Sequence, residues 1–433
     1  MDTAQKLSQE LIDYIHDGAS PFHVVDKTAL MLDQAGFQPL NLREKWQLKQ
    51  GGKYYTTRND SSIFAFIVGT GEPEEEGFRI IAAHSDSPSF KLKPSPEIGV
   101  DGHYIKLNTE VYGGPILMTW LDRPLSLAGR VSLKGGHPLW PDNRLVNFNR
   151  PLLTIPSLAI HLNRSVNEGV ELKRQTHMLP LLGIMPDETH KNGLIKHLLS
   201  EELGVDSDEI LDFDLTLNEY NRGCLMGLHN ELISSPKLDN LAMTHAGLLS
   251  LLTSKPGKAT QMLCIFDNEE VGSLTKQGAD SPVFRHIFER ILGQFGKSGE
   301  QFYRTVYNSF MISADMAHSV HPNFTEKHDP VLHPLINKGP VIKITANQKY
   351  TSDSDSIAVF ESICQRADVP YQKFVNHSDI VGGSTLGNVS TGQLDIRSVD
   401  VGNPMLAMHS VRELAGVKDH EYIIRAFSEF YSL

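Results

Sequence analysis

Imidazole and carboxylate side chains follow three segments of this sequence that have the pattern of buried strands. Each segment is followed at once by polar residues: Phe78–Ala83 by His84 and Asp86, Met262–Phe266 by Glu269 and Glu270, and Phe310–Ala314 by Asp315. In an open α/β sheet, ligands collect outside the carboxyl ends of the strands. We therefore expect the three segments to deliver these side chains to one edge of a sheet.

Two further residues extend this set and suggest a metal. Asp239 precedes a predicted helix, and His409 follows a predicted strand near the C-terminus. A mixed nitrogen and oxygen set without thiolates suits zinc or manganese, and favours hydrolytic over redox chemistry. A two-metal site needs one carboxylate that bridges ions about 3.5–4 Å apart. Asp239, at the start of a rigid helix, is a candidate for that bridge.

The adjacent acids Glu269 and Glu270 suggest a division of labour. Side chains alternate along an extended backbone, so one can face a metal and the other a water molecule. A general base needs a pKa near the working pH, which burial raises and metal charge lowers. Asp86, two residues after His84, can hold the imidazole tautomer from behind the metal site.

Taken singly, each of these residues has a simpler structural explanation. A histidine after a strand is commonly a surface or hydrogen-bonded residue, and the tripeptide of His84 recurs at His377–Asp379. An aspartate before a helix is commonly an N-cap. Glu269 and Glu270 could also be acids that favour the first turn of a helix. Asp315 could simply end a strand, with His318 and His321 as competing ligands, and His409 could pack under the last helix. Only joint placement favours the metal site.

Other catalytic motifs are missing from the sequence. It contains no G-x-x-x-x-G-K-[ST] loop for nucleoside triphosphates and no H-E-x-x-H helix. The segment Gly382–Gly387 includes Ser384 but lacks the G-x-S-x-G spacing of a nucleophile elbow. We interpret it as a glycine-rich wall that a substrate backbone can approach closely.

Alternating helix and strand patterns predict the scaffold for these residues. Helices are expected at Leu7–Ile15, Val25–Leu32, Leu241–Leu252 and Val283–Leu292, and from Glu421 onward. Strands are expected at Ile63–Val68, Phe78–Ala83, Met262–Phe266, Phe310–Ala314, Val341–Thr345 and Leu394–Val401. This order predicts an α/β fold with a mainly parallel central sheet formed by 1–93 and 236–433, interrupted by a proline-punctuated, β-rich insertion at 94–235.

Composition narrows the class of protein. The 433 residues include 52 acidic and 40 basic side chains, a net charge of -12 that opposes binding to nucleic acid or to an acidic membrane surface. No apolar run approaches the ~20 residues of a membrane span, and the N-terminus lacks the pattern of a signal peptide. The three cysteines, Cys224, Cys264 and Cys364, suggest no disulfide framework. These features predict a soluble, cytoplasmic protein.

Five ordered motifs resemble those of the aspartyl aminopeptidase family. They are Ala83–Pro88, Ser235–Asn240, Asp267–Ser273, Ser313–Pro322 and Met405–Arg412. The resemblance implies a zinc exopeptidase with two ions per subunit that removes N-terminal residues, often acidic ones, from peptides. It implies that His84 and Asp315 bind one ion, that Glu270 and His409 bind the other, and that Asp239 bridges them. Glu269 becomes the general base and Asp86 the residue that orients His84.

The same resemblance extends to assembly and specificity. It implies that the insertion is a dimerisation domain and that subunits form a tetrahedral dodecamer, in which His161 reaches a neighbouring active site; a buried histidine is the alternative. Lys343 and Tyr350 resemble substrate-contacting residues, with Lys343 as the cation for a substrate carboxylate or, alternatively, a solvated strand-end charge. The loop Asn376–Val381 differs from that of animal members, which leaves a neutral preference open. Manganese or cobalt are possible substitutes for zinc, and a deacylase or a self-assembling scaffold are the rival functions.

Overall fold

The computed structural model describes residues 1–184 and 193–433, which divide into two compact units. The first unit comprises residues 1–86, 223–408 and 413–433, and the second comprises 87–222 together with 409–412. The insertion was expected at 94–235, without the short segment at 409–412.

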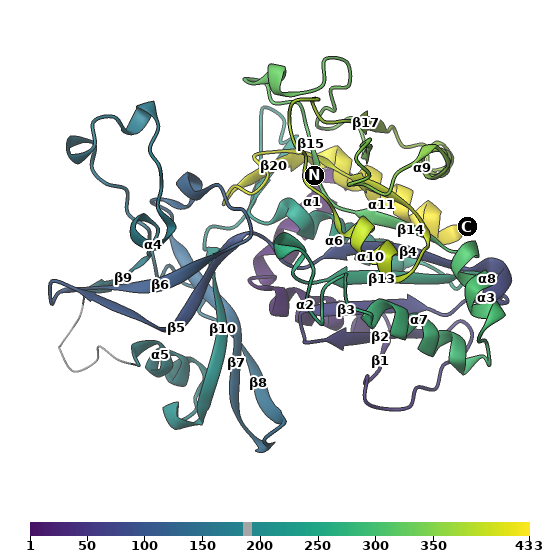
Figure 1. Ribbon diagram of the computed structural model, residues 1–433, viewed down its shortest axis with the longest axis horizontal. Coiled ribbons are helices and arrows are strands. Elements are labelled where there is room, and N and C mark those ends of the chain that lie inside the picture. The colour runs from purple at the N-terminus through teal and green to yellow at the C-terminus, as the bar shows by residue number, and fades with distance from the viewer. Residues whose placement is uncertain (185–192) are drawn as a thin grey trace. The chain divides into compact units, whose positions relative to one another are not determined.

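A nine-stranded sheet forms the centre of the first unit (Figure 1). Its strands, in spatial order, are β1 (Gln38–Pro39), β2 (Lys53–Arg58), β3 (Ser62–Ile67), β13 (Thr260–Phe266), β4 (Phe78–His84), β14 (Phe310–Ala314), β18 (Arg397–Gly402), β16 (Val341–Lys343) and β17 (Gln372–Phe374). The four strands β13, β4, β14 and β18 run parallel to their neighbours within this group. The prediction of an α/β fold with a mainly parallel central sheet is confirmed, and antiparallel pairing is found at β2–β3, β3–β13 and β16–β18.

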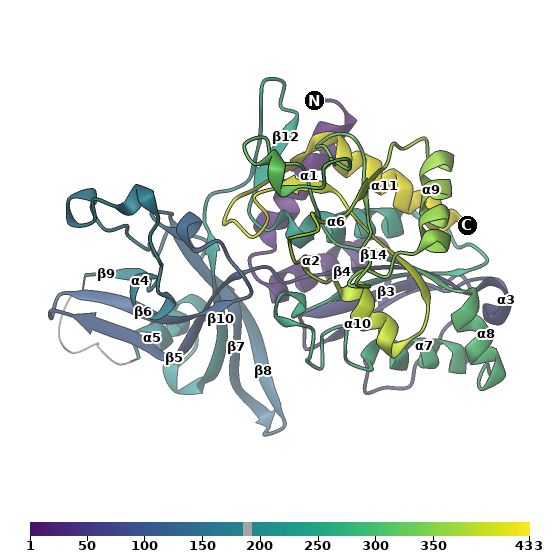
Figure 2. The same cartoon turned by 45° about the horizontal axis from the view of Figure 1, so that its top comes forward.

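Helices cover both faces of this sheet (Figures 1 and 2). One apolar core joins the sheet to α1 (Thr3–Asp17), α2 (Pro21–Gln34), α6 (Leu238–Thr253), α9 (Ser354–Arg366) and α11 (Val417–Ser432). A second core joins the other face to α7 (Val283–Gln294), α8 (Glu300–Asn308) and α10 (Leu386–Gln393). Alternate residues of β4 serve the two cores, since Ile81 belongs to the first and Ile80 to the second. Burial on both faces explains why these strands are continuously apolar.

The strand and the helix predicted nearest the C-terminus have other boundaries in the structure. The strand expected at Leu394–Val401 begins only at Arg397, because the N–H groups of Leu394 and Ile396 bond locally to the carbonyls of Ser390 and Leu394. The last helix begins at Val417 and not at Glu421. Its first turn contains the buried Val417, Asp419 and His420, whose polar members obscure the apolar periodicity.

A smaller sheet completes the first unit. Its order is β11 (Cys224–Met226), β12 (Leu232–Ser235), β20 (Glu413–Gly416), β19 (Pro404–Leu406) and β15 (Ala317–His318). The strands β12 and β20 flank two sequence motifs, since Ser235 leads into the Asp239 segment and Glu413 follows the His409 segment.

The second unit is a six-stranded antiparallel sheet with its own apolar core. Its order is β8 (Trp140–Asn147), β7 (Leu125–His137), β10 (Ile210–Glu219), β5 (Ser89–Val100), β6 (Tyr104–Tyr112) and β9 (Leu181–Ile184), with α5 (Leu194–Leu203) packed into the core. Val411 belongs to the same core, which places the segment that follows His409 in this unit. Among the helices of the described ranges, none has the length and apolarity needed to cross a membrane.

Candidate metal centre

The carboxyl ends of neighbouring strands bring the predicted ligands of the first unit together. His84 is the last residue of β4, and Asp315 follows β14, which pairs directly with β4. The imidazole Nε2 of His84 lies 3.6 Å from Asp315 Oδ1 and 3.7 Å from Asp239 Oδ1. These three side chains form a group that could hold a cation.

A second group shares His84 and adds the two adjacent glutamates. Ligand atoms of His84, Glu269 and Glu270 lie within 4.8 Å of one another, and a Glu270 oxygen also lies within 4.8 Å of an Asp239 oxygen. Glu269 and Glu270 occupy a single turn of 3-10 helix that follows Asn268, whose φ is 62°. The expected extended backbone at this pair is therefore wrong: the left-handed Asn268 turns the chain away from the direction of β13.

Asp86 contacts both His84 and the turn that carries Glu269 and Glu270. Its Oδ1 lies 3.2 Å from His84 Nδ1 and also accepts the backbone N–H of Glu269 at 3.1 Å, while Oδ2 accepts the N–H of Glu270 at 3.1 Å. One fully buried carboxylate thus contacts both the imidazole and the turn that carries the glutamates. The contact with His84 was anticipated from the sequence, but the two bonds from the turn were not.

Asp239 is held at the start of α6 but does not cap it. The N-cap is Lys237, and Asp239 and Asn240 have non-helical dihedral angles, with a cis peptide bond between them. The Asp239 N–H donates to Glu413 Oε2 at 3.0 Å, and the Asn240 side-chain amide donates to the Ala314 carbonyl at 2.8 Å. These contacts leave the Asp239 carboxylate on the side of His84.

Burial and mutual repulsion dominate the electrostatics of this cluster. Burial, together with neighbouring carboxylates, raises the pKa of Glu269 to about 8 and that of Glu270 well above its usual range. Burial alone would lower the pKa of His84, but its bonds with Asp315 and Asp86 raise it well above the ordinary value. So many buried oxygens around one imidazole are unfavourable without a positive charge among them.

Lys343, the last residue of β16, is a buried cation beside this cluster. Its ammonium donates to Asp315 Oδ2 at 3.1 Å and lies 5.7 Å from the centre of the Tyr350 ring. Burial would raise the pKa of Asp315, but Lys343 and His84 lower it below its usual value. With 3% of its surface exposed, Lys343 is not a solvated strand-end charge.

Two further predicted residues belong to the second unit. His409 belongs to the second unit, where its Nδ1 lies 3.1 Å from the Gly114 carbonyl oxygen. His161 is also in the second unit and is exposed, so the alternative of a buried histidine is wrong. The rival ligands His318 and His321, and the repeated tripeptide at His377–Asp379, contribute to none of the cation-holding groups found among the described residues.

Three residues of the cluster had not been predicted. Glu413 is buried and accepts from Asp239, and Thr244 Oγ1 donates to the His84 carbonyl at 2.8 Å. Asp267 is buried near Asp86, and burial raises its pKa to about 7. A signal was available for Glu413 and Asp267, since each is an acid within or beside one of the five motifs. Thr244 lies inside an apolar helix pattern, and no sequence signal indicated its contact with His84.

Comparison with known proteins places the chain in a family. A sequence profile described as "Aminopeptidase I zinc metalloprotease (M18)" matches residues 14–431. This chain belongs to the M18 family of zinc metalloproteases. The resemblance to the aspartyl aminopeptidase family and the prediction of a metalloaminopeptidase are thereby confirmed at the level of the family.

Individual M18 proteins are similar over nearly the whole chain. A relative from Clostridium acetobutylicum, named "Probable M18 family aminopeptidase 2", is 53% identical over 433 residues, which cover 100% of both chains. A chain in the cryo-EM structure of the Ape4 and Nbr1 complex matches with a TM-score of 0.95 at 38% identity, covering 99% of this chain and 86% of that one. The S. cerevisiae mApe1 dodecamer structure matches with a TM-score of 0.86 at 27% identity, covering 98% and 96%.

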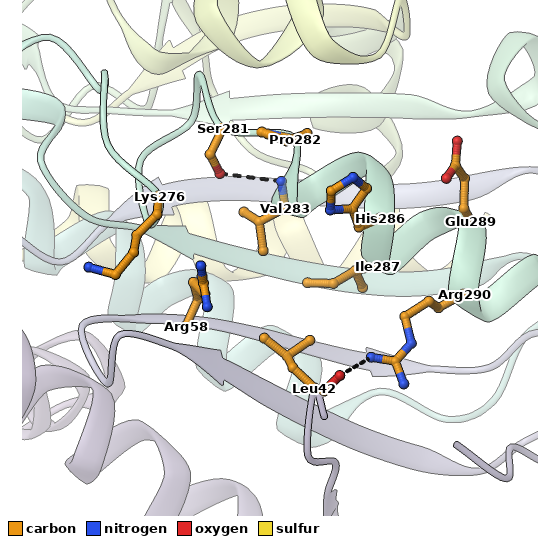
Figure 3. A pocket seen from close by; sticks show the side chains of 10 residues that line it. All are labelled: Leu42, Arg58, Lys276, Ser281, Pro282, Val283, His286, Ile287, Glu289 and Arg290. Atoms are coloured by element: carbon orange, nitrogen blue, oxygen red, sulfur yellow. Dashed lines mark hydrogen bonds between the residues drawn. The ribbon is translucent and has the colours of Figure 1, made fainter. Parts of the chain in front are cut away.

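A separate hollow in the first unit contains none of the predicted site residues (Figure 3). Its volume is about 680 Å³, and several basic side chains line it, including Arg58, Lys276 and Arg290. Arg290 donates to the Leu42 carbonyl at 2.8 Å and stacks on the Trp46 ring at 3.9 Å. The Arg290 guanidinium therefore connects α7 to the segment that follows β1.

Proposed function

We propose that this M18 protein is a dinuclear zinc aminopeptidase that removes N-terminal residues, preferentially Asp and Glu, from peptides. The observation that carries the proposal is the sharing of His84 between two groups of potential ligands, one with Asp239 and Asp315 and one with Glu269 and Glu270. A buried arrangement of this kind is costly to fold unless cations neutralise it.

The donor set fits zinc. Zinc takes nitrogen and carboxylate oxygen at 2.0–2.2 Å, so neighbouring ligands in a tetrahedron lie about 3.4 Å apart. The spacings of 3.6 Å and 3.7 Å around His84 Nε2 are close to that value. By the family resemblance, His84 and Asp315 would hold one ion, Glu270 and His409 would hold the other, and Asp239 would be available to both. The Nδ1 atom of each histidine contacts a backbone carbonyl oxygen, of Asp86 for His84 and of Gly114 for His409, which would leave Nε2 of each ring available to a metal.

Within this assignment Glu269 is the general base. Zinc bound here would supply Lewis-acid activation of a water molecule and of the peptide carbonyl. Glu269 is the glutamate not assigned as a ligand, so it would be free to take a proton from the water and return it to the leaving amine. Asp86 fixes the His84 ring and the turn that carries Glu269.

Lys343 and Tyr350 are the proposed selectivity residues. A buried ammonium beside Asp315 supplies a positive charge near the cluster, which favours an acidic side chain on the first residue of the peptide. Since Lys343 already pairs with Asp315, a neutral first residue is the alternative that the experiment must separate.

We further propose that the protein works as a homo-oligomer in the cytoplasm. The S. cerevisiae relative is named as a dodecamer, and we extend to this chain a tetrahedral dodecamer built from dimers through the second unit. His161 is exposed beside the apolar and exposed Ile160 and Leu162, which suits a segment that reaches a neighbouring subunit. The three described cysteines are free, which suits a reducing compartment.

A panel of aminoacyl reporter substrates tests the proposed function. Chelator-stripped protein is assayed with and without added zinc, manganese or cobalt, and we expect release of single N-terminal Asp or Glu only after metal is restored. Hydrolysis of N-acetylated peptides would instead indicate a deacylase. Normal assembly of a protein that binds no metal and cleaves nothing would indicate a scaffold.

A further inference from the structure

A buried carboxylate outside the metal cluster fastens two loops together. Asp400, in β18, is 0% exposed. Its Oδ2 accepts the N–H and the hydroxyl of Thr351 at 2.6 Å and 2.8 Å, and its Oδ1 accepts the hydroxyl of Thr385 at 2.5 Å. Thr351 lies in the loop between β16 and α9, and Thr385 ends the loop between β17 and α10. A single carboxylate therefore accepts hydrogen bonds from donors in both loops.

The two loops are also joined directly to each other. Lys349 Nζ donates to the Gly382 carbonyl at 2.7 Å. The side-chain amide of Asn388, in the helix α10 that follows the second loop, donates to the Gln348 carbonyl at 2.5 Å. The Tyr350 hydroxyl shares a hydrogen bond with the side chain of Asn376. The glycine-rich segment that we interpreted as a substrate wall is thus bonded to the segment that carries Tyr350.

This pair of loops reaches the metal cluster through Tyr350. The Tyr350 ring lies against the Lys343 ammonium, which donates to Asp315, which in turn lies 3.6 Å from His84. Thr351, the residue bonded twice to Asp400, directly follows Tyr350. A shift at Thr351 therefore moves the ring beside Lys343.

Little space is left around the Asp400 carboxylate. A Cβ atom added at Gly387 would lie 2.9 Å from both Asp400 Oδ1 and Ser313 Oγ, so this position in α10 has room only for glycine. The carboxylate also lies at the first turn of α10, since it contacts Thr385 and the space beside Gly387. The position of Asp400 is therefore fixed by its surroundings.

We propose that Asp400 is a positioning residue that sets the place of the Tyr350 segment and of the glycine-rich segment Gly382–Gly387 against the first residue of the bound peptide. This inference rests on the proposed aminopeptidase function. It adds that the substrate wall is a two-loop unit held by one carboxylate that contacts neither metal nor substrate.

The Asp400→Asn variant of the full-length protein tests this role. Asparagine keeps the shape but removes the charge and one acceptor oxygen, so the Thr351 segment loosens. We expect KM for aminoacyl reporters to rise about tenfold with little change in kcat and in bound zinc, because Glu269 and the ligands stay in place. Hydrogen exchange of the segments 345–352 and 380–388 should accelerate.

Asp419→Asn is the matched control. Asp419 is also a buried aspartate, and it accepts the backbone N–H groups of Asn337 and Gly339 at 2.5 Å and 2.8 Å, away from both loops. If Asp400→Asn and Asp419→Asn change KM equally, or if exchange in the two segments is unaltered, the proposal is overturned. Should Asp400→Asn fail to fold, Thr385→Val removes a single donor and is expected to raise KM in the same direction; an unchanged KM in that variant contradicts the proposal.

Exchange and kinetics also separate this inference from the proposed function. If the wild-type protein releases no N-terminal residue, the proposed function fails. Exchange in the two segments then still decides whether Asp400 holds them.

Discussion

The Asp86 carboxylate lies 3.2 Å from the His84 imidazole and accepts the backbone N–H groups of Glu269 and Glu270. A single side chain therefore sets the orientation of a proposed ligand and the position of the turn that carries a second ligand and the proposed base. Groups behind metal ligands are commonly worth 10–100-fold in metal affinity or activity.

Asp86→Asn is accordingly expected to lower zinc affinity or kcat by about 10–100-fold. The amide has only one acceptor oxygen, so one N–H of the turn loses its charged partner. Competition with a chromogenic chelator measures affinity, and reporter hydrolysis measures kcat. Asp419→Asn, which also removes a carboxylate that accepts two backbone N–H groups, should leave both quantities near the wild-type values. Equal losses in the two variants would assign the effect to stability alone.

The Glu269→Gln variant distinguishes a role of Glu269 as general base from a role as metal ligand. The amide cannot take a proton, so kcat should fall by about 10²–10⁴-fold while two zinc ions per chain are retained. Elemental analysis of the purified protein checks the metal, and single-turnover assays check the chemistry. Normal turnover in this variant would refute the role of Glu269, and loss of one zinc would make Glu269 a ligand.

Lys343→Met tests the acidic preference. Losing a charge-assisted hydrogen bond, worth about 1.5–3 kcal/mol, should lower kcat/KM for Asp and Glu reporters by about 10–100-fold more than for a Leu reporter. Lys343→Arg keeps the charge and should preserve the direction of the preference. A loss of the same size on acidic and neutral reporters would mean that Lys343 serves only to hold Asp315.

The sequence predicts the parts of the site that sit at strand ends. His84 and Asp315 follow apolar runs that are recognisable alone, and parallel neighbours in a sheet necessarily end at the same edge. The mainly parallel sheet is predictable for the same reason, since buried strands have a continuous apolar pattern.

Contacts between segments distant in the chain were beyond prediction. The Lys343 ammonium pairs with Asp315, which excludes only the alternative of a solvated charge. The pairing itself was not expected, because nothing in the local pattern indicates which carboxylate a strand-end lysine meets. The 3-10 turn at Glu269 depends on the left-handed Asn268, a conformation that asparagine adopts only in some contexts. The hydrogen bonds of Asp400 with Thr351 and Thr385 could be predicted only from the order of strands in the sheet, in which β18 lies between β14 and β16.

A buried pair of histidines, His245 in α6 and His420 in α11, predicts how the free energy of unfolding depends on pH. His245 Nδ1 lies 3.0 Å from His420 Nε2, and both side chains are about 1% exposed. Burial lowers the pKa of His420 to about 3, and burial together with His420 lowers that of His245 well below its usual value. Both are neutral in the folded protein, whereas the unfolded chain binds protons below about pH 6.5. Their contribution is thus complete above that pH and is lost as the pH falls toward 3.

His420→Gln should remove one of these two proton uptakes. Between pH 7.5 and pH 5.5 the wild-type protein is expected to lose about 1.4 kcal/mol more unfolding free energy than the variant, which is the effect of one histidine one pH unit below its unfolded pKa. Burial raises the pKa of the neighbouring Asp419 to about 7, which has the opposite effect, but it is present in both proteins and cancels in the difference. Urea unfolding at equal chain concentration measures this difference, with the exposed His286→Gln as the control. Parallel pH curves for the wild type and His420→Gln would show that the folded protein already accepts a proton at this pair.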